Sequence, residues 1–390
     1  MKRKKSLAVL GTGSDVGKSI LAAGLCRILS RHRTDLSVAP FKGQNMSNNA
    51  YPALTQQGDY GEIGIAQAIQ ARACRHVPVV EVRKYRCVGV PVRVGLPILS
   101  RASSWQQQEH WEQMNHPVHT FFLTHTSLSV SLSLSVCLSQ MNPILLKSGG
   151  QRASDGAYLC SVFVCGKLLA TEDFGALKRR TQTLMDVVVN AHHALQADVV
   201  ILEGAGSCTE LNLLDRDVVN LPLVVGRLQS PWILVANIDP GGVFAQIIGT
   251  KACVSAAEWD LCVGIVVNKL RGDAKYFEPG PRILQERVGN KPIFVIPYLY
   301  NINIAEEDGM GLERKLTREH LLDDQADETT TRNKKRIVVI CYPHISMTDD
   351  LLPVEQDERL QVEWRRMVVP RRPPAAIVLP GSRQTRSDME

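Results

Sequence analysis

Short apolar runs alternate with longer amphipathic segments along most of the chain. The runs, several of them rich in β-branched residues, are residues 7–10, 199–202, 232–237, 263–268 and 292–297. Between them, segments such as 18–30 and 62–73 place apolar residues at i, i+3 and i+4, as amphipathic helices do. Strands that are apolar on both faces and alternate with helices predict an α/β fold, with a mostly parallel sheet covered by helices on both faces.

The alternation changes near the C-terminal end of the sequence. Residues 317–335 (TREHLLDDQADETTTRNKK) are polar and charged, and they predict a linker. Two apolar runs follow, RIVVICYP from Arg336 and AAIVLPGS from Ala375. We expect residues 336–390 to hold the first strands of another α/β domain, which stops before it closes a core.

Composition narrows the class of protein. The 390 residues suffice for two or three domains, and 44% apolar with 22% charged residues is typical of a soluble globular protein. No apolar run of about 18 residues predicts a membrane span. The net charge of +6 is modest and partly local to MKRKK, which predicts a solvated tail rather than a nucleic-acid or membrane tether. Ten cysteines without CxxC or zinc spacing indicate reduced thiols and a cytoplasmic location.

The first apolar run leads directly into GTGSDVGKS and then into a predicted helix. Glycines let consecutive backbone N–H groups point at phosphate oxygens, and the helix start adds the positive end of its dipole. Lys18 is placed to reach the β- and γ-phosphates, and the Ser19 hydroxyl to bind Mg²⁺. Thr12 stands where the usual P-loop has its first glycine, and a chance GKS is the alternative. The residues predicted to bind ATP are Gly11, Thr12, Gly13, Gly17, Lys18 and Ser19.

Two more polar residues follow predicted strands. Glu203 ends the run 199–202, and ligands of open α/β sheets collect at such strand ends. We predict that Glu203 shares Mg²⁺ with Ser19, the alternative being an acid in a surface turn. Asn268 ends the run 263–268, where its amide can hydrogen-bond a purine edge. An ordinary turn asparagine fits that position equally well.

At these residues the chain resembles the cobyric acid synthase family of amidotransferases, whose ATP-binding part has the P-loop fold of dethiobiotin synthetase. QNMSNNA and LDRDVVN are far more specific than a P-loop, and the resemblance covers nearly the whole chain except about 82–140. The matching strings are GTGSDVGKS, VAPFKGQNMSNNA, GEIGIAQAIQARA, MNPILLK, EGAGSCTELNLLDRDVVN, NIDPGGVFAQIIGT, VVNKLRGD, CYPHISMTDDLLP and IVLPGSRQT.

The resemblance implies a division of labour. Residues 1–81 and 141–316 would form the synthetase domain, 317–335 a linker and 336–390 the start of a glutaminase domain. ATP would phosphorylate side-chain carboxylates of adenosylcobyrinic acid a,c-diamide, and ammonia from glutamine would displace phosphate, giving adenosylcobyric acid in cobalamin biosynthesis. The catalytic Cys and His of the glutaminase lie beyond the LPGS strand in relatives, so free ammonia is the expected donor. A homodimer or a separate glutaminase subunit is left open.

The family motifs also suggest roles for single residues. Asp59 or Glu62, around the start of GEIGIAQ, would add a metal contact, and Asn268 would read adenine. One departure is Pro240, where the family usually has an arginine. That change removes a cation that could meet phosphate or carboxylate.

The LDRD string (residues 214–217) and the first two residues of QNMSNNA supply candidates for contacts with the corrinoid. With Lys18, Asp215 and Asp217 would be the catalytic residues, and the substrate contacts would be Gln44, Asn45 and Arg216. A capped, salt-bridged surface turn is the alternative for LDRD.

Three other interpretations stay open. ParA/MinD-like ATPase switches share the fold, but they carry a second lysine where this chain has Gly13. Dethiobiotin synthetase is much shorter and lacks QNMSNNA. An inactive remnant of a synthase is made plausible by the insertion and the truncation.

Residues 82–140 fit neither strand nor helix, and we predict that they are translated intron. Removing them joins VPVVE to MNPILLK, as in relatives. They begin Val82-Arg83-Lys84, which GTG AGG AAG encodes, as in a splice donor. They end in SLSVSLSLSVCLSQ, which fits a pyrimidine tract closed by CAG. The alternative is a low-complexity surface loop, although loops of this length are uncommon in compact domains.

Overall fold

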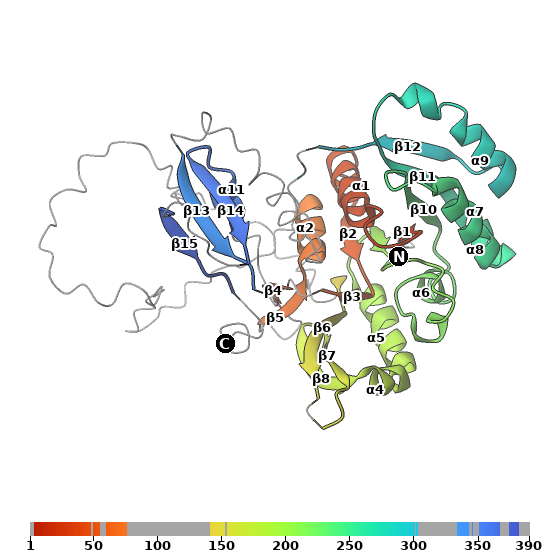
Figure 1. Ribbon diagram of the computed structural model, residues 1–390. Coiled ribbons are helices and arrows are strands. Elements are labelled where there is room, and N and C mark those ends of the chain that lie inside the picture. Colours follow the sequence, from red (N-terminus) through yellow and green to blue (C-terminus); the bar gives the residue numbers. More distant parts are fainter. Residues whose placement is uncertain are drawn as a thin grey trace, which may run out of the picture. The chain divides into compact units, whose positions relative to one another are not determined.

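The computed structural model describes part of the chain (Figure 1). The predicted insertion 82–140, Asp59 and nearly all of the predicted linker lie outside the described residues. The described ranges are residues 4–47, 50–54, 60–75, 141–152, 154–300, 302, 334–342, 345, 351–366 and 374–381.

A six-stranded parallel sheet, in the order β12-β11-β10-β1-β9-β2, positions the site. Its strands follow the apolar runs closely, so the predicted parallel α/β sheet is confirmed. Because all strands run the same way, their C-terminal ends lie at one edge. The strands are β1 (Lys5–Gly11), β2 (Val38–Phe41), β9 (Val199–Glu203), β10 (Trp232–Asn237), β11 (Cys262–Leu270) and β12 (Ile293–Pro297).

Both faces of this sheet are covered, because successive residues of a strand point to opposite faces. In β1, Val9 packs in one cluster with Cys26 of α1, whereas Leu10 packs in another with Val188 of α5 and Ile247 of α7. The helices are α1 (Lys18–His32), α2 (Ile65–Ala73), α4 (Phe174–Arg179), α5 (Thr181–Ala194), α6 (Leu221–Val224), α7 (Val243–Cys253), α8 (Ala256–Asp260) and α9 (Gly280–Val288), with 3₁₀ turns η1 (Leu214–Arg216) and η2 (Ala274–Phe277).

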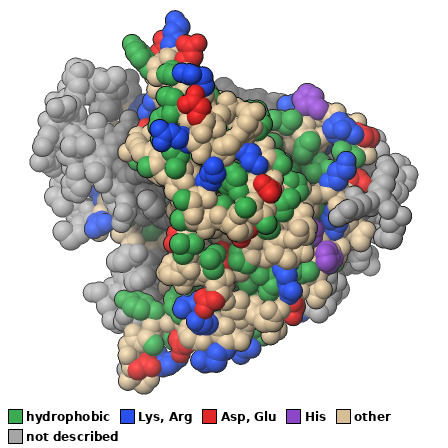
Figure 2. Space-filling view, turned by 90° about the vertical axis from the view of Figure 1, so that its right-hand side faces the viewer, with side chains coloured by type: hydrophobic (Ala, Val, Ile, Leu, Met, Phe, Trp, Pro, Cys, Tyr) green, Lys and Arg blue, Asp and Glu red, His purple; other side chains and the backbone are tan. Residues whose placement is uncertain are grey.

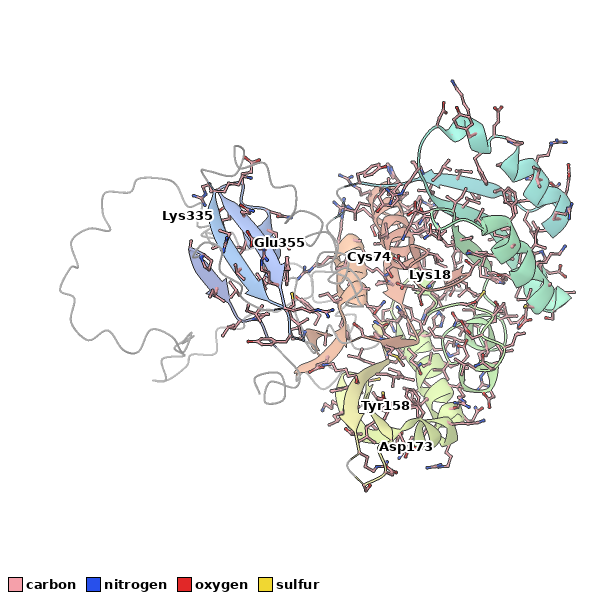
Figure 3. The ribbon with its side chains drawn as sticks, in the orientation of Figure 1. Lys18, Cys74, Tyr158, Asp173, Lys335 and Glu355 are labelled. Carbon is pink, nitrogen blue, oxygen red and sulfur yellow. The ribbon has the colours of Figure 1, made fainter. Side chains whose placement is uncertain are left out.

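A second, mixed sheet, in the order β3-β6-β7-β8, was not predicted. β3 is parallel to β6, and the pairs β6–β7 and β7–β8 are antiparallel. Asp173 ends β8, and its carboxylate caps α4 by accepting the Ala176 N–H at 2.9 Å (Figure 3). This sheet therefore fixes where α4 begins. Its strands are β3 (Gln44–Met46), β6 (Ile144–Gln151), β7 (Tyr158–Val164) and β8 (Lys167–Asp173).

The predicted helix 62–73 begins later than expected. Residues Tyr60–Gly64 form β5, which pairs antiparallel with β4 (Ala50–Leu54), and α2 starts only at Ile65. Glu62 is thus a strand residue. The tetrapeptide GEIG is extended because two glycines weaken a helix and because the ladder to β4 satisfies its backbone.

The last three strands form a parallel sheet in the order β14-β13-β15, of which β13 and β15 were predicted from the runs at Arg336 and Ala375 and β14 was not. They are β13 (Lys335–Ile340), β14 (Leu360–Arg365) and β15 (Ala376–Val378), with the short helix α11 (Leu352–Glu355). Val339, Cys341 and Trp364 form its small core. The Trp364 indole N–H donates to the Glu355 carboxylate at 2.7 Å.

Positively and negatively charged side chains are interspersed over the face shown in Figure 2. Within the described part of the chain, each helix is too short or too polar to serve as a membrane span.

His192 of α5 gives the fold a testable pH dependence. Its buried ring packs edge-on against Phe41, 5.3 Å between centroids, and Nε2 lies 3.2 Å from the Ser6 hydroxyl. Burial, together with the charges of Lys4 and His193, lowers the pKa of His192 from 6.5 to about 3. The folded state therefore binds this proton more weakly than the unfolded chain. The resulting stability is complete above pH 6.5 and falls as the pH drops toward 3.

Between pH 7 and pH 5, the free energy of unfolding of the unaltered chain should decrease. We expect this decrease to be about 2 kcal/mol larger than the decrease in the His192→Gln variant, which lacks the titrating ring. Urea unfolding at both pH values measures the difference. His193→Gln, on the exposed neighbouring residue, is the control and should keep the full pH dependence. Equal pH dependence in His192→Gln and the unaltered chain would contradict the burial of a neutral imidazole.

Candidate functional site

The P-loop, residues 11–19, joins β1 to α1 at the C-terminal edge of the parallel sheet (Figure 1). Gly17 caps α1 with φ of 99°, a left-handed conformation, and a Cβ there would lie 2.2 Å from Nδ2 of Asn268. Only glycine fits this position. Thr12 pairs with Ser207 in a β-bridge, and its hydroxyl donates to Gln246 at 3.1 Å. The P-loop thus lies against the chain that follows β9.

Lys18 connects these two loops. Its ammonium donates to the carbonyl of Gly13 at 2.7 Å and to that of Gly206 at 2.9 Å. The side chain is buried, so the cation is held within the loops rather than in bulk solvent. Gly13, the position where switch ATPases have a lysine, contributes its carbonyl.

Glu203 lies at the centre of a buried polar cluster. Phe41 pairs with Leu202 across β2 and β9, so the next residues, Lys42 and Glu203, emerge side by side. The Lys42 ammonium lies 3.0 Å from Oε1 of Glu203, and the Ser19 hydroxyl donates to the same oxygen at 2.7 Å. Gln70 of α2 donates to Oε2. Ser19 and Glu203 are therefore brought together as predicted.

The carboxylate of Glu203 is only 1% exposed. Burial by itself raises the pKa of Glu203. The Lys42 ammonium and the hydrogen bonds from Ser19 and Gln70 outweigh that effect and hold the pKa below its ordinary value. Glu203 is thus an anion at neutral pH, as a metal-binding carboxylate must be.

Asp217 holds the loop that follows Glu203. Its Oδ1 accepts the N–H groups of Val219 and Asn220, each at 2.7 Å, and its Oδ2 accepts the Asn220 amide at 3.0 Å. Asn220 in turn bonds both the N–H and the carbonyl of Ala205, at 3.1 and 2.9 Å. Asp217 lines the pocket, but these contacts favour a positioning role over the predicted catalytic one.

Asp215 and Arg216 belong to a charged turn. Lys178 of α4 lies 2.6 Å from Oδ2 of Asp215, and Nε of Arg216 lies 3.5 Å from Oδ1. The hydrogen bond and charge of Lys178 lower the pKa of Asp215. Lys178 and Arg216 line the pocket and Asp215 does not. The salt-bridged turn is therefore real, and it presents two cations to the pocket.

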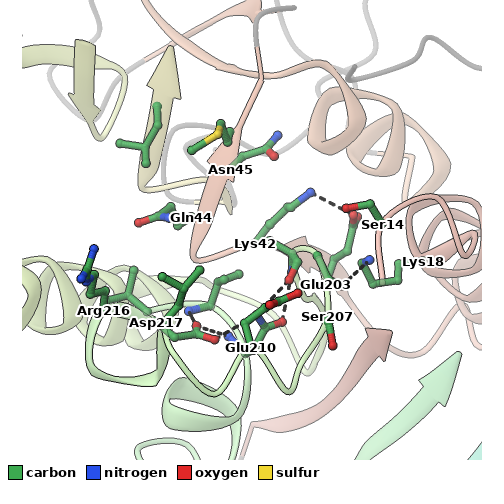
Figure 4. A pocket seen from close by; sticks show the side chains of 18 of the residues that line it. Ser14, Lys18, Lys42, Gln44, Asn45, Glu203, Ser207, Glu210, Arg216 and Asp217 are labelled. Carbon is green, nitrogen blue, oxygen red and sulfur yellow. Dashed lines mark hydrogen bonds and ion pairs between the residues drawn. The ribbon is translucent and has the colours of Figure 1, made fainter. Parts of the chain in front are cut away.

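One pocket of about 660 Å³ contains most of the predicted site. Figure 4 shows Lys18 and Ser14 on one side of it, Arg216 on the opposite side, and Lys42 and Glu203 between them. Gln44 and Asn45 lie on the wall formed by β3. The lining also includes apolar side chains, among them Met46 of β3, Phe174 and Leu177 of α4, and Leu213 directly before η1.

Like Asp215, Gly11, Thr12 and Gly13, two more predicted residues do not line this pocket, namely Glu62 and Asn268. The carboxylate of Glu62 forms an ion pair with Lys147 and does not line this pocket, so the structure does not bring it to Glu203. Asn268 donates its side-chain amide to the carbonyl of Val16 at 2.9 Å, which braces the P-loop from β11. Its adenine contact stays a prediction.

Near Pro240 the structure has another cation. Arg271 makes two hydrogen bonds to Asp239, at 2.5 and 3.2 Å, and its guanidinium stacks 3.6 Å from the Tyr298 ring. The β10–α7 turn thus carries a positive charge beside it, although Pro240 itself has none.

Sequence reasoning missed Lys42, Gln70 and Asn220 as site residues. Lys42 follows a buried strand, so the strand-end rule that found Glu203 also applies to it. Gln70 was detectable as a polar residue on the apolar face of a predicted helix. Asn220 is the last residue of LDRDVVN, the string that supplied Asp215, Arg216 and Asp217 as candidates.

A parallel sheet with a P-loop after its first strand and a carboxylate at the end of a neighbouring strand defines a P-loop nucleotide-binding protein. Residues 7–312 match the model of the CobQ/CobB/MinD/ParA nucleotide binding domain. The chain therefore belongs to this family.

Curated relatives carry the name cobyric acid synthase. The chain is 32% identical to the protein of Chlorobium phaeobacteroides over 99% of its length, and 33% identical to that of Sorangium cellulosum over 98%. It is 35% identical to that of Sphingopyxis alaskensis over 98%. The chain spans 61%, 59% and 63% of these three relatives, respectively.

Proposed function

We propose that the chain catalyses the ATP-dependent amidation of corrinoid carboxylates in cobalamin biosynthesis. The substrate is adenosylcobyrinic acid a,c-diamide, each carboxylate is phosphorylated and then attacked by ammonia, and the product is adenosylcobyric acid. The observation that carries this proposal is one pocket with a P-loop at one end and an apolar, cationic wall at the other. The names of the relatives support the same activity.

The nucleotide end has the residues that ATP with magnesium requires. The Ser19 hydroxyl and the Glu203 carboxylate place oxygen atoms 2.7 Å apart at the end of β9. No group of three or more His, Cys, Asp or Glu side chains suited to a metal occurs among the described residues. A magnesium ion held by few protein oxygens, with phosphate and water completing its shell, is typical of nucleotide sites. When bound, it would neutralise phosphate charge.

Lys42 is placed between the two ends of the pocket. Its ammonium lies beside Glu203, and the next residues along the chain lead to Gln44 and Asn45 on the wall formed by β3, which we call the substrate wall. A fixed cation at this point stabilises the negative charge that passes between the γ-phosphate and the attacking carboxylate. Lys18, at the P-loop, would stabilise the charge on the phosphate side.

The wall of the pocket opposite the P-loop suits a large ring that bears carboxylates. Phe174, Leu177 and Leu213 offer apolar surface. Lys178 and Arg216 face the same space, while the anion they share, Asp215, lies outside the lining. An ammonium has three donors and a guanidinium five, so both retain donors for substrate carboxylates.

Phosphate release from ATP, measured with and without adenosylcobyrinic acid a,c-diamide and ammonium, tests the proposal. We expect release to depend on the corrinoid and to be matched by amide formation detected by mass. Release that proceeds equally without the corrinoid would instead favour an ATPase switch. Absence of release under every condition, from folded protein that binds ATP, would favour an inactive remnant.

Reversing the charge of Lys178 should weaken corrinoid binding selectively. We expect Lys178→Glu to raise the KM for the corrinoid by about tenfold, with the KM for ATP nearly unchanged, because Lys178 pairs with Asp215 next to Arg216, which lies on the side of the pocket opposite Lys18. Arg179→Glu is the matched control, since it makes the same charge change on the same helix outside the pocket lining. Equal effects of the two substitutions would contradict a local carboxylate contact.

A further inference from the structure

Two buried glutamines lie on α2, and only one of them, Gln70, has been placed in the site so far. Gln67 and Gln70 are both 0% exposed, and neither lines the pocket. They are three residues apart, so their side chains are neighbours on one face of the helix. A glutamine amide buried on an apolar face requires hydrogen-bond partners on both of its polar atoms.

Each glutamine contacts one end of the site. Oε1 of Gln67 accepts the side-chain amide of Asn45, on the substrate wall, at 3.1 Å. Nε2 of Gln70 donates to Oε2 of Glu203, at the nucleotide end, and lies 3.4 Å from the carbonyl of Ser19. A Cβ on residue 64 would lie 2.1 Å from Nδ2 of Asn45, so Gly64 permits the contact between Asn45 and Gln67.

The two remaining amide atoms are complementary. Nε2 of Gln67 and Oε1 of Gln70 are both buried and have no hydrogen-bond partner in the described part of the chain. One is a donor and the other is an acceptor. A single hydrogen bond between them, reached by side-chain rotation, would satisfy both atoms at once.

The direction of this row of hydrogen bonds is fixed by Glu203, at its end. An ionised carboxylate only accepts hydrogen bonds, so Gln70 must turn its NH₂ group toward Glu203 and its carbonyl away. The side-chain carbonyl of Gln70 then needs a donor, which the NH₂ group of Gln67 supplies. The side-chain carbonyl of Gln67 in turn accepts the NH₂ group of Asn45. Every group would therefore donate toward Glu203, and hydrogen bonds aligned in this way polarise one another.

We propose that Gln67 donates to Gln70 when the site is loaded, completing a relay from Asn45 through both glutamines to Glu203. The relay positions the carboxylate of Glu203 and couples it to the substrate wall. Gln67 and Gln70 are positioning residues, because they act through Glu203 and Asn45. The relay itself is independent of the ligand at Asn45, whereas coupling to a corrinoid rests on the proposed function.

The affinity of the full chain for magnesium with a non-hydrolysable ATP analogue tests the relay. Methionine is unbranched and similar in volume to glutamine, but it lacks an amide. We expect Gln67→Met to weaken binding about fivefold and Gln70→Met about twentyfold. The double variant should bind no more weakly than Gln70→Met, because residue 67 acts only through residue 70. Ser30→Ala is the control, since it removes a buried hydroxyl without a partner from α1 and should leave affinity unchanged.

If Gln67 has a purely structural role, Gln67→Met lowers the melting temperature but binds magnesium and the ATP analogue as tightly as the unaltered chain. That result would overturn the proposal. Additive losses in the double variant overturn it as well. If the variants fail to fold, a structure of the unaltered chain with magnesium and the analogue decides. Nε2 of Gln67 should then lie within about 3.2 Å of Oε1 of Gln70, and a clearly longer separation contradicts the relay.

The corrinoid provides a separate readout. In the unaltered chain, adenosylcobyrinic acid a,c-diamide should tighten binding of the ATP analogue by about fivefold or more, and Gln67→Met should abolish this gain. Corrinoid binding is followed by its visible absorbance. A corrinoid that binds without tightening the analogue contradicts the coupling and leaves the proposed function standing. A corrinoid that does not bind contradicts the proposed function, and the nucleotide measurements still decide the relay.

Discussion

Replacing Lys18 with alanine is expected to lower ATP turnover at least about 100-fold, the loss typical when a preorganised donor to a developing charge is removed. The ammonium of Lys18 is held by the carbonyls of Gly13 and Gly206, one from each loop that borders the phosphate end of the pocket. Its position is therefore fixed by both loops. Alanine removes both the cation and the link between the loops, so both binding and the chemical step should suffer.

Phosphate release measures the effect, with circular dichroism to establish that the variant is folded. Lys269→Ala is the matched control, because Lys269 also contacts the P-loop, through the carbonyl of Asp15 at 2.6 Å, but does not line the pocket. We expect it to reduce turnover less than tenfold. Unaltered ATP turnover in the folded Lys18→Ala variant would contradict the assignment of the nucleotide site to the P-loop.

The parallel sheet and the nucleotide end could be predicted because both follow from local rules. Apolar runs marked the strands, and the residues that follow such strands meet at one edge. Ser19 and Glu203 were assigned to one site in this way, and the Ser19 hydroxyl lies 2.7 Å from Oε1 of Glu203. The predicted nucleotide-binding family is confirmed by the match of residues 7–312, and relatives named cobyric acid synthase are 32–35% identical over 98–99% of the chain.

The mixed sheet could not be predicted in the same way. Residues of β8 are mostly exposed, and β6 contains the polar stretch KSGGQ, so neither strand stands out as an apolar run. Register between β6, β7 and β8 depends on pairing partners rather than on any one segment. The location of Phe174 and Lys178 depends on this sheet, because Asp173 at its edge caps the helix that carries them.

The LDRD string shows how two interpretations of one motif can both describe a structure. Asp217 accepts three hydrogen bonds that fix the loop after Glu203, and Asp215 accepts Lys178, so the turn is capped and salt-bridged. Arg216 nevertheless lines the pocket. A pattern of charges identifies the turn, but only the three-dimensional structure separates the carboxylates that hold it from the cations that face the pocket.

Replacing Glu203 with glutamine is expected to affect turnover and stability together. Turnover should fall at least about 100-fold, because the amide is neutral and a poor magnesium ligand. The free energy of unfolding should fall by about 3–5 kcal/mol, the usual cost of breaking a buried ion pair. The reason is Lys42, whose side chain is 4% exposed and whose ammonium lies 3.0 Å from Glu203. Without the carboxylate, that charge is left in the core.

A double variant separates the two effects. Lys42→Met combined with Glu203→Gln removes the uncompensated charge while keeping the volume, so most of the lost stability should return, as it does when buried ion pairs are replaced by apolar residues. Turnover should stay as low as in Glu203→Gln, because neither a metal-binding carboxylate nor the cation beside it is present. Urea unfolding and phosphate release measure the two quantities on the same samples. Recovery of turnover together with stability would show that the ion pair serves the fold alone, and that the metal is held elsewhere.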